Sequence, residues 1–339
     1  MKYQDIISDL RQGKFQPVYL LSGEEAFFID ELTNLIIDQA LRPEERDFNQ
    51  SILYGRETDM QTVINEAKRY PMMSERVLVL VKEAQHLRNW DLLEPYLEQP
   101  QSSTVLVFAF KEKKPDKRKK VFKTLSNRYV FFSSKKLYDN ELPHWIESRL
   151  KMYQYRIDPV ATRMIAESVG SDLSRLDNEL NKLLLGHPKE TIISPEVVEA
   201  NIGISKDYNN FELQDALAHR DLARIIRIQQ YFASAPKNHP LLLTISALYR
   251  FFSQIMLLHY HRGKPERELA KALGVHPFFL KDYQLAAKTY GTRQCAYIIG
   301  YLREYDARSK GVGNVGVPHE ELLREIGRAS CRERVCHRV

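Results

Sequence analysis

The pattern of hydrophobic positions in the first part of the chain alternates between two periods. Short runs of consecutive apolar residues, rich in β-branched side chains, occur at 18–21, 77–81 and 104–110. Such runs are typical of strands that are buried on both faces of a sheet. Between them, stretches such as 24–40 and 60–67 repeat apolar residues at helical spacing. The alternation predicts an α/β domain with a parallel sheet. Weaker signals predict strands at 48–54 and 129–132 and helices near 89–97 and 116–126.

Strand signals stop near Asp139, and every later segment repeats apolar residues at helical spacing. Gly170 and Gly203 punctuate a small helical block, and a larger one begins at Asn209. The run 239–261 is apolar on nearly all faces, so its helix needs neighbours on several sides. We therefore expect three domains: an α/β domain over 1–138, a small helical domain over 139–208 and an all-α domain over 209–325.

The last fourteen residues, 326–339, look like the translation of a sequencing-adapter oligonucleotide, and we treat them as non-native. They carry four arginines and one glutamate, so the formal charge of +6 for the whole chain falls to +3 for the remainder. This balance is only mildly basic. The tail also holds Cys331 and Cys336, which leaves Cys295, expected to be a buried small hydrophobe.

Two expectations concern the ends of the chain. A final amphipathic helix beginning near Pro318 is cut off after Leu322 and Leu323, and residues 326–339 should be poorly ordered. The amino terminus has no basic segment followed by an apolar run, and no stretch approaches the ~20 apolar residues of a membrane span. We therefore expect a cytoplasmic protein without a membrane partner.

The turn after the first predicted strand reads Ser22-Gly23-Glu24-Glu25 and opens a helix. A phosphate-binding loop here would need several glycines, a lysine for the phosphates and a Ser or Thr for magnesium. The two glutamates satisfy the positive end of the helix dipole and repel an anion. The turn predicts a domain that has the fold of nucleotide-binding proteins but binds no nucleotide, cofactor or metal. An NTPase with an unconventional site is the alternative.

Four strings in a fixed order and spacing carry a resemblance to a known family: YPMMSERVLVLV at 70–81, GSDLSRLDNELNKL at 170–183, FELQDA at 211–216 and SKGVGN at 309–314. With them, the chain resembles the delta subunits of bacterial DNA polymerase III over nearly all of 1–325. The resemblance implies an AAA+-like first domain with a parallel sheet, a small helical lid and an all-α C-terminal collar.

The resemblance also implies a function. A delta subunit binds and opens the β sliding clamp without hydrolysing ATP, so we expect no catalytic site of its own within the DNA polymerase III holoenzyme, a nucleotidyltransferase complex. Implied partners are the clamp, the gamma/tau and delta-prime type subunits reached through the collar, and primed DNA in the replisome on the nucleoid. Two positions agree: the string LVKEA at 80–84 lacks the Asp-Glu pair of an ATPase, and Leu173 replaces the nucleotide-sensing arginine of active relatives, with Arg175 out of register.

The family holds the clamp with an apolar pair at the tip of the helix before the third strand. Matching that motif assigns the pair to Met72 and Met73, flanked by Pro71. Phe or Leu is commoner in the pair, which leaves open which methionine lies deeper. Because Pro71 cannot continue a helix, two flexible apolar side chains would be presented at a corner. Taken alone, a methionine pair at this place would also fit core packing.

The densest basic run, 111–120, holds seven Lys or Arg residues against two acids. It could follow DNA phosphates, with Lys117, Arg118, Lys119 and Lys120 as possible contacts. Because the run has no interleaved aromatic residues for base stacking, a solvated loop and helix start fits it at least as well.

The segment 269–285 has the spacing of a helix-turn-helix with Gly274 at the turn, which would make the protein a DNA-binding regulator. The other interpretation is a helix start at Pro277 inside the helical bundle. His259 and His261 have no Cys or acidic partner at metal-ligand spacing, so we expect no metal site there.

Overall fold

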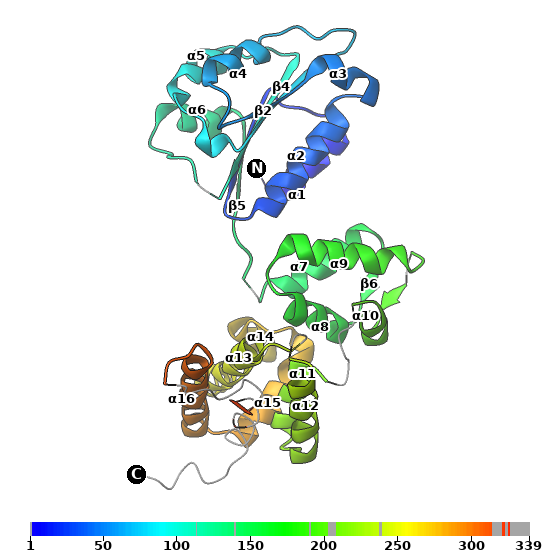
Figure 1. Cartoon of the computed structure of the whole chain (residues 1–339), viewed down its shortest axis with the longest axis vertical. Coiled ribbons are helices and arrows are strands. Elements are labelled where there is room, and N and C mark those ends of the chain that lie inside the picture. The colour runs from blue at the N-terminus through cyan, green and yellow to red at the C-terminus, as the bar shows by residue number, and fades with distance from the viewer. Residues whose placement is uncertain are drawn as a thin grey trace. The chain divides into compact units, whose positions relative to one another are not determined.

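The computed structural model of the chain (Figure 1) describes residues 2–112, 114–138, 140–189, 191–202, 208–236, 239–313, 321, 322 and 325. The chain divides into two compact units, Met1–Leu137 and Tyr138–Val339.

Unit 1 is built on a five-stranded sheet in the order β2-β3-β4-β1-β5, and all of its neighbouring strands are parallel. The strands are β1 (Val18–Gly23), β2 (Gln50–Tyr54), β3 (Val77–Lys82), β4 (Thr104–Lys111) and β5 (Val130–Ser134). Nearly every residue of the three inner strands is buried, as predicted for strands covered on both faces. The parallel sheet predicted from the sequence is thus confirmed.

Helices cover both faces of this sheet. One face packs against α1 (Tyr3–Arg11) and α2 (Ala26–Ala40), and the other against α4 (Met60–Ala67), α5 (Glu94–Glu98) and α6 (Lys120–Arg128) (Figure 1). Short helical turns complete the unit: η1 (Pro43–Glu45), α3 (Arg46–Asn49), η2 (Ala84–His86) and η3 (Trp90–Leu93).

Three predicted element starts in unit 1 are wrong: the helix predicted over 24–40 begins at Ala26, and the other two have a visible cause. The strand predicted over 48–54 begins only at Gln50, because Phe48 and Asn49 belong to α3. The helix predicted near 116–126 begins at Lys120, because the Asp116 carboxylate accepts a hydrogen bond from the Arg118 backbone N–H at 3.1 Å and holds a turn outside the helix.

Unit 2 begins with helices α7 (Leu142–Met152), α8 (Pro159–Val169), α9 (Leu173–Leu185) and α10 (Pro195–Ile202). It also contains a parallel pair of very short strands, β6 (Arg156–Ile157) and β7 (Ile192–Ile193). These strands correct the expectation that strand structure ceases near Asp139. Two residues are too few to produce a recognisable alternation in the sequence.

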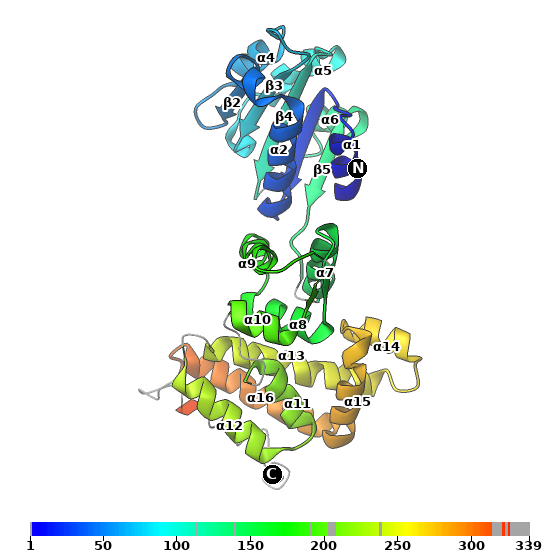
Figure 2. The same cartoon turned by 90° about the vertical axis from the view of Figure 1, so that its right-hand side faces the viewer.

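The remaining helices of unit 2 are α11 (Asn210–Ala218), α12 (Leu222–Ser234), α13 (Leu241–Tyr260), α14 (Glu266–Leu273), α15 (Leu280–Thr289) and α16 (Thr292–Ser309), with the turn η4 (Pro277–Phe279) before α15. Figure 2 shows α13 running alongside α16. Phe252 and Ile255 of α13 are completely buried in the shared core of these helices. The prediction that this apolar helix needs several neighbours is confirmed.

Helix α13 also corrects one expectation. It is long and apolar enough to cross a membrane by length and composition, although no such stretch was expected. Half of that stretch is buried inside the protein, so packing against α11, α14, α15 and α16 accounts for its apolar character.

The carboxy-terminal expectations fall partly outside the described residues. Glu321 and Leu322 are helical, and Leu322 is fully buried in the core of α11 to α16. The Arg308 guanidinium lies 3.2 Å from the Glu325 carboxylate. Pro318, Leu323 and the segment 326–339 lie outside the described residues, as does Gly203.

Cys295 should resist alkylation while the protein is folded. It is buried and not in a disulfide, and burial raises the pKa of its thiol to about 11. At pH 8 only about one thiol in a thousand would then be the reactive thiolate. In a Cys331→Ser/Cys336→Ser variant, we expect iodoacetamide labelling to be slow in buffer and fast in urea, measured by mass spectrometry. Equal rates in the two conditions would contradict the burial.

Candidate functional site

The segment 68–76 between α4 and β3 forms an exposed loop, which we call the tip loop. Helix α4 ends at Ala67, and the N–H of Arg69 still bonds to the Glu66 carbonyl oxygen at 3.2 Å. Pro71 excludes Tyr70 from the helical region, so the chain leaves the helix a few residues before the proline. The helix therefore ends at Ala67, the last residue of the predicted stretch 60–67.

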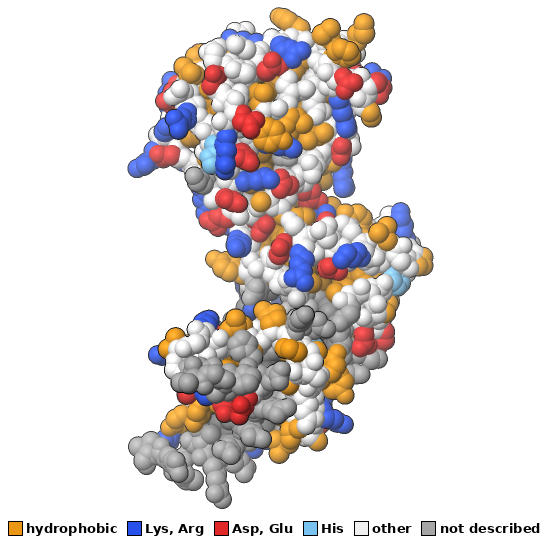
Figure 3. All heavy atoms as spheres, in the orientation of Figure 1, with side chains coloured by type: hydrophobic (Ala, Val, Ile, Leu, Met, Phe, Trp, Pro, Cys, Tyr) orange, Lys and Arg blue, Asp and Glu red, His pale blue; other side chains and the backbone are white. Residues whose placement is uncertain are grey.

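Large apolar side chains cover the tip loop. Met73 is fully exposed at 101%, Met72 is 57% exposed and Tyr70 is 77% exposed. Phe48 of the neighbouring α3 is 62% exposed, and Figure 3 shows hydrophobic side chains on the surface at this end of unit 1. The two methionines are thus not part of the core of this chain.

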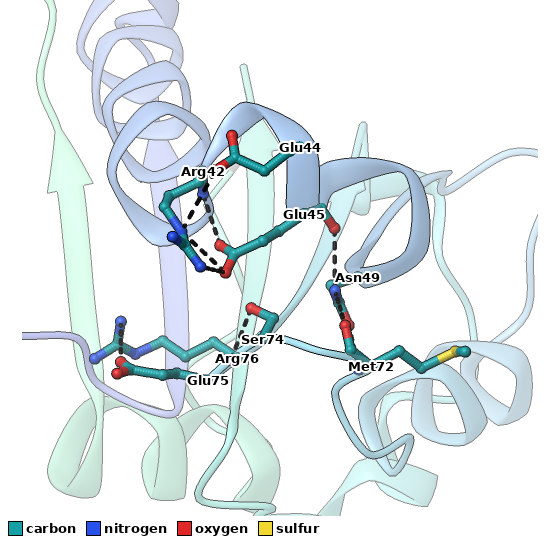
Figure 4. Close-up of polar contacts among 8 residues, drawn as sticks. All are labelled: Arg42, Glu44, Glu45, Asn49, Met72, Ser74, Glu75 and Arg76. Atoms are coloured by element: carbon teal, nitrogen blue, oxygen red, sulfur yellow. Dashed lines mark hydrogen bonds and ion pairs between the residues drawn. The ribbon is translucent and has the colours of Figure 1, made fainter.

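The backbone of the tip loop is held by one buried side chain, Asn49 at the end of α3 (Figure 4). Its Oδ1 accepts a hydrogen bond from the Met72 N–H at 2.7 Å, and its Nδ2 donates to the Met72 carbonyl oxygen at 2.9 Å. Nδ2 also donates to the Glu45 carbonyl oxygen at 3.0 Å. Met73, the next residue, has φ +52°, a left-handed conformation that is uncommon for a residue with a side chain.

A polar network braces the segment from which Asn49 projects. The Arg42 guanidinium and backbone N–H donate to the Glu45 carboxylate at 2.7 and 2.9 Å. The Arg42 side chain, followed by its backbone N–H, lowers the pKa of Glu45, and the Ser74 hydroxyl contributes further. At the exit of the tip loop, the Arg76 guanidinium lies 4.9 Å above the ring of Phe15. The loop is therefore tied to the domain at several points.

The turn between β1 and α2 is filled by Ser134 of β5. Its carbonyl oxygen accepts a hydrogen bond from the Glu24 N–H at 3.4 Å, and its hydroxyl accepts one from the Glu25 N–H at 3.2 Å. The same hydroxyl donates to the Glu25 carbonyl oxygen at 2.8 Å. The Glu25 carboxylate accepts from the Phe27 N–H at the start of α2. Backbone N–H groups that would have to converge on a phosphate thus already have protein partners.

The negative charge of Glu24 at this turn already has a partner. The Glu24 carboxylate pairs with the Lys114 ammonium at 2.8 Å, and a hydrogen bond from that ammonium is the main cause that lowers the pKa of Glu24. At the end of β3, where an ATPase has its Asp-Glu pair, the Glu83 carboxylate is paired with the Arg56 guanidinium at 3.0 Å. Leu173 is buried at the start of α9, and Arg175 is exposed.

The predicted DNA-contacting residues are exposed, but most already have partners. Lys117 lies 4.8 Å above the ring of Phe131, Arg118 pairs with Asp116 at 2.9 Å, and Lys120 pairs with Glu94 at 2.7 Å. Lys119 is exposed just before α6. Exposed pairs of this kind contribute about 0–1 kcal/mol, so these cations could exchange their partners for phosphates at little cost.

The helix-turn-helix spacing is present, with Gly274 in the left-handed conformation between α14 and η4. Leu280, Tyr283 and Ala286 of α15 are buried in the helical core, whereas Lys281 and Lys288 are exposed. One face of α15 therefore packs in the helical bundle, as expected if the segment is a bundle helix and not a DNA-reading helix.

His259 is a satisfied histidine: its Nε2 lies 2.8 Å from the Tyr290 carbonyl oxygen and its Nδ1 2.8 Å from the Arg262 guanidinium. His261 packs edge-on against the ring of Tyr260. In the described part of the chain, no group of three or more His, Cys, Asp or Glu side chains is arranged to hold a metal ion.

Comparison with known proteins gives consistent matches over most of the chain. Sequence models of the families "DNA polymerase III, delta subunit" and "DNA polymerase III delta subunit, C-terminal domain" match residues 19–135 and 207–315. The DNA polymerase III subunit delta of Bacillus subtilis is 27% identical over 336 residues, which cover 95% of this chain and 94% of the relative.

The solved structure of the Bacillus subtilis DNA clamp loader delta protein (YqeN) matches 98% of this chain and 100% of its own, with 25% identity and a TM-score of 0.55. With the parallel five-stranded sheet and the largely helical C-terminal part, this match confirms the predicted AAA+-like fold class.

Replacing Gly23 by Ala should destabilise unit 1 by about 3 kcal/mol or more. An added Cβ would collide with the hydroxyl and backbone oxygens of Ser134, at a φ of +135°. Gly13→Ala is the matched control: Gly13 also has positive φ, +71°, but nothing lies within 4 Å of an added Cβ. We expect it to cost only about 1 kcal/mol in urea unfolding, since it adds strain without a collision. Equal losses for the two variants would contradict the close packing of Ser134 on the turn.

Proposed function

The chain belongs to the DNA polymerase III delta subunit family, and from this premise we propose that it binds the β sliding clamp through the tip loop and opens it for loading onto primed DNA. Its direct contacts would be Pro71, Met72 and Met73. The observation that carries the proposal is the exposure of two large apolar side chains on a loop whose backbone is held by Asn49.

The energetics of such a contact support the proposal. Complete burial of a methionine side chain contributes about 1.5–3 kcal/mol, so two can anchor an interface when the surrounding contacts exclude water. Tyr70 and Phe48 lie nearby and would extend the apolar surface. Methionine is flexible and fills irregular pockets well, which suits an apolar pocket on the clamp.

We further propose that the subunit does not hydrolyse ATP and serves the holoenzyme without a catalytic site of its own. Two observations support this: Ser134 engages the backbone N–H groups of the turn after β1, and Glu83 at the end of β3 is paired with Arg56. The alternative of an unconventional NTPase predicts hydrolysis by the isolated subunit.

The second unit would serve assembly. We propose that residues 139–208 act as the lid and 209–325 as the collar, which packs with gamma/tau and delta-prime type subunits of the loader. The continuous core from Leu213 to Leu322 supports a single collar domain, and Leu222 and Ile226 of α12 are exposed apolar residues available for such packing. The protein would act in the cytoplasm, at the replisome on the nucleoid.

We also propose that the basic run 111–120 contacts DNA. Lys117, Arg118, Lys119 and Lys120 are exposed, and their existing pairs are weak enough to exchange. A regulator built on 269–285 has less support, since one face of α15 is buried in the bundle.

Replacing Met72 and Met73 by Ala should weaken binding to the β sliding clamp at least about tenfold, because the variant can bury far less apolar area. The affinity can be measured by titrating labelled clamp. The matched control is Met152→Ala/Leu185→Ala, which removes two apolar side chains of unit 2 that are 45% and 89% exposed. Both variants should keep the unfolding midpoint of the parent. Unchanged clamp affinity in the first variant would rule out this site.

The purified subunit should show no ATP hydrolysis above background. Saturating Mg-ATP should also leave its melting temperature unchanged, because only a ligand that binds the folded protein would raise the melting temperature. An active ATPase subunit of the loader provides the positive control for both assays. Turnover or a clear upward shift would favour the unconventional NTPase instead.

A further inference from the structure

We infer that Asn49 is a positioning residue for clamp binding, which fixes the tip loop in the conformation that presents Met72 and Met73. The inference rests on the proposed function, because it assigns a role within the same site. Asn49 itself is buried, with 2% exposure, and would not touch the clamp. Its effect would pass through the backbone of Met72.

The amide of Asn49 is fully engaged in one orientation. It accepts from the Met72 N–H and donates to the Met72 carbonyl oxygen, as a neighbouring backbone strand would do, and it donates its other N–H to the Glu45 carbonyl oxygen. Rotating the amide by half a turn would bring oxygen against oxygen and N–H against N–H. The side chain therefore sets both the position and the direction of the peptide groups around Met72.

The tip loop has little else to order its backbone. Within the part of the chain that the structure describes, the backbone groups of residues 70–75 form hydrogen bonds with Asn49 alone. Each backbone residue that must be ordered during binding costs roughly five- to thirtyfold in affinity. An amide that orders Met72 in the free protein removes part of that cost before the clamp arrives.

The conformation of Met73 gives a second reason why the hydrogen bonds from Asn49 to Met72 are needed. Its φ of +52° is unfavourable for a residue with a Cβ and persists only where the surrounding structure imposes it. Met73 is itself fully exposed, so its own side chain contributes no packing that could hold this conformation. The fixed peptide groups of the preceding Met72 supply the constraint.

Asn49 is well placed for this role because its own support is rigid. It ends α3, directly before the edge strand β2, and the preceding turn is braced by the Arg42–Glu45 pair (Figure 4). The backbone of Met72 is thereby connected to the segment that enters the sheet through one buried amide. Ser74 and Arg76 hold only the loop's exit.

The test is a double-mutant cycle on clamp affinity with the full-length chain. Asn49→Ala should weaken binding about tenfold in the parent, the cost of ordering about one residue. In the Met72→Ala/Met73→Ala background, the same change should have less than about a twofold further effect, since the loop then has little left to present. A merely structural role of Asn49 would weaken both backgrounds equally.

Two further variants control for folding and for the loss of an amide. Asn49→Asp keeps the shape of the side chain but places oxygen against the Met72 and Glu45 carbonyl oxygens, so it should lower affinity at least as much as Asn49→Ala. Asn127→Ala removes an exposed amide on α6 and should leave affinity unchanged. Unfolding curves identify any variant that does not fold. If Asn49→Ala is one of these, the near-isosteric Asn49→Asp replaces it in the affinity comparison.

The outcomes separate the two proposals. If Met72→Ala/Met73→Ala binds like the parent, the proposed clamp site is wrong and the role of Asn49 falls with it. If that variant binds weakly but both Asn49 variants bind like the parent, or weaken both backgrounds equally, only the positioning role is overturned. Weak binding by both Asn49 variants, with little further loss in the methionine background, supports both proposals.

Discussion

The parallel sheet of unit 1 is the constraint on which its other features depend. Because every neighbouring pair of strands is parallel, each connection must cross a face of the sheet, and helices cover both faces. All turns that leave a strand lie at one end of the sheet, and all loops that enter a strand lie at the other. The turn at Gly23 therefore lies opposite the tip loop, which enters β3 (Figure 1). The exposed apolar tip loop and the turn closed by Ser134 are thus separated by the length of the strands.

The two ends of the sheet have been stabilised in the same way, by a polar side chain that satisfies backbone groups. At one end, Ser134 bonds to the peptide groups of Glu24 and Glu25 and closes the turn. At the other end, Asn49 bonds to the peptide groups of Met72 in the exposed tip loop. The physical rule is the same, since backbone N–H and C=O groups need partners. The results are opposite: a filled turn and an exposed apolar loop.

Much of this could be predicted from the sequence, and the errors have local causes. Consecutive β-branched residues predict the buried strands, and apolar residues on every face predict the buried helix α13. Asn49 was hidden inside a segment predicted as a strand, although an asparagine is uncommon in strands and could have signalled a break. The short strands β6 and β7 left no pattern to find. Asp116 displaced the start of α6 through a hydrogen bond that residue periodicity does not report.

The sequence by itself determined the fold class, the lack of a glycine-rich phosphate loop and the choice of Met72 and Met73 as candidate clamp contacts, because periodicity, single residues and a family motif are all local properties of the chain. Only the tertiary structure decided that those methionines are exposed and that Asn49 and Ser134 complete the two ends of the sheet. Each of these contacts joins residues that are distant in the sequence, 23 positions apart for Asn49 and Met72 and 109 for Glu25 and Ser134. Such pairings arise when the strands assemble, and no local pattern encodes them.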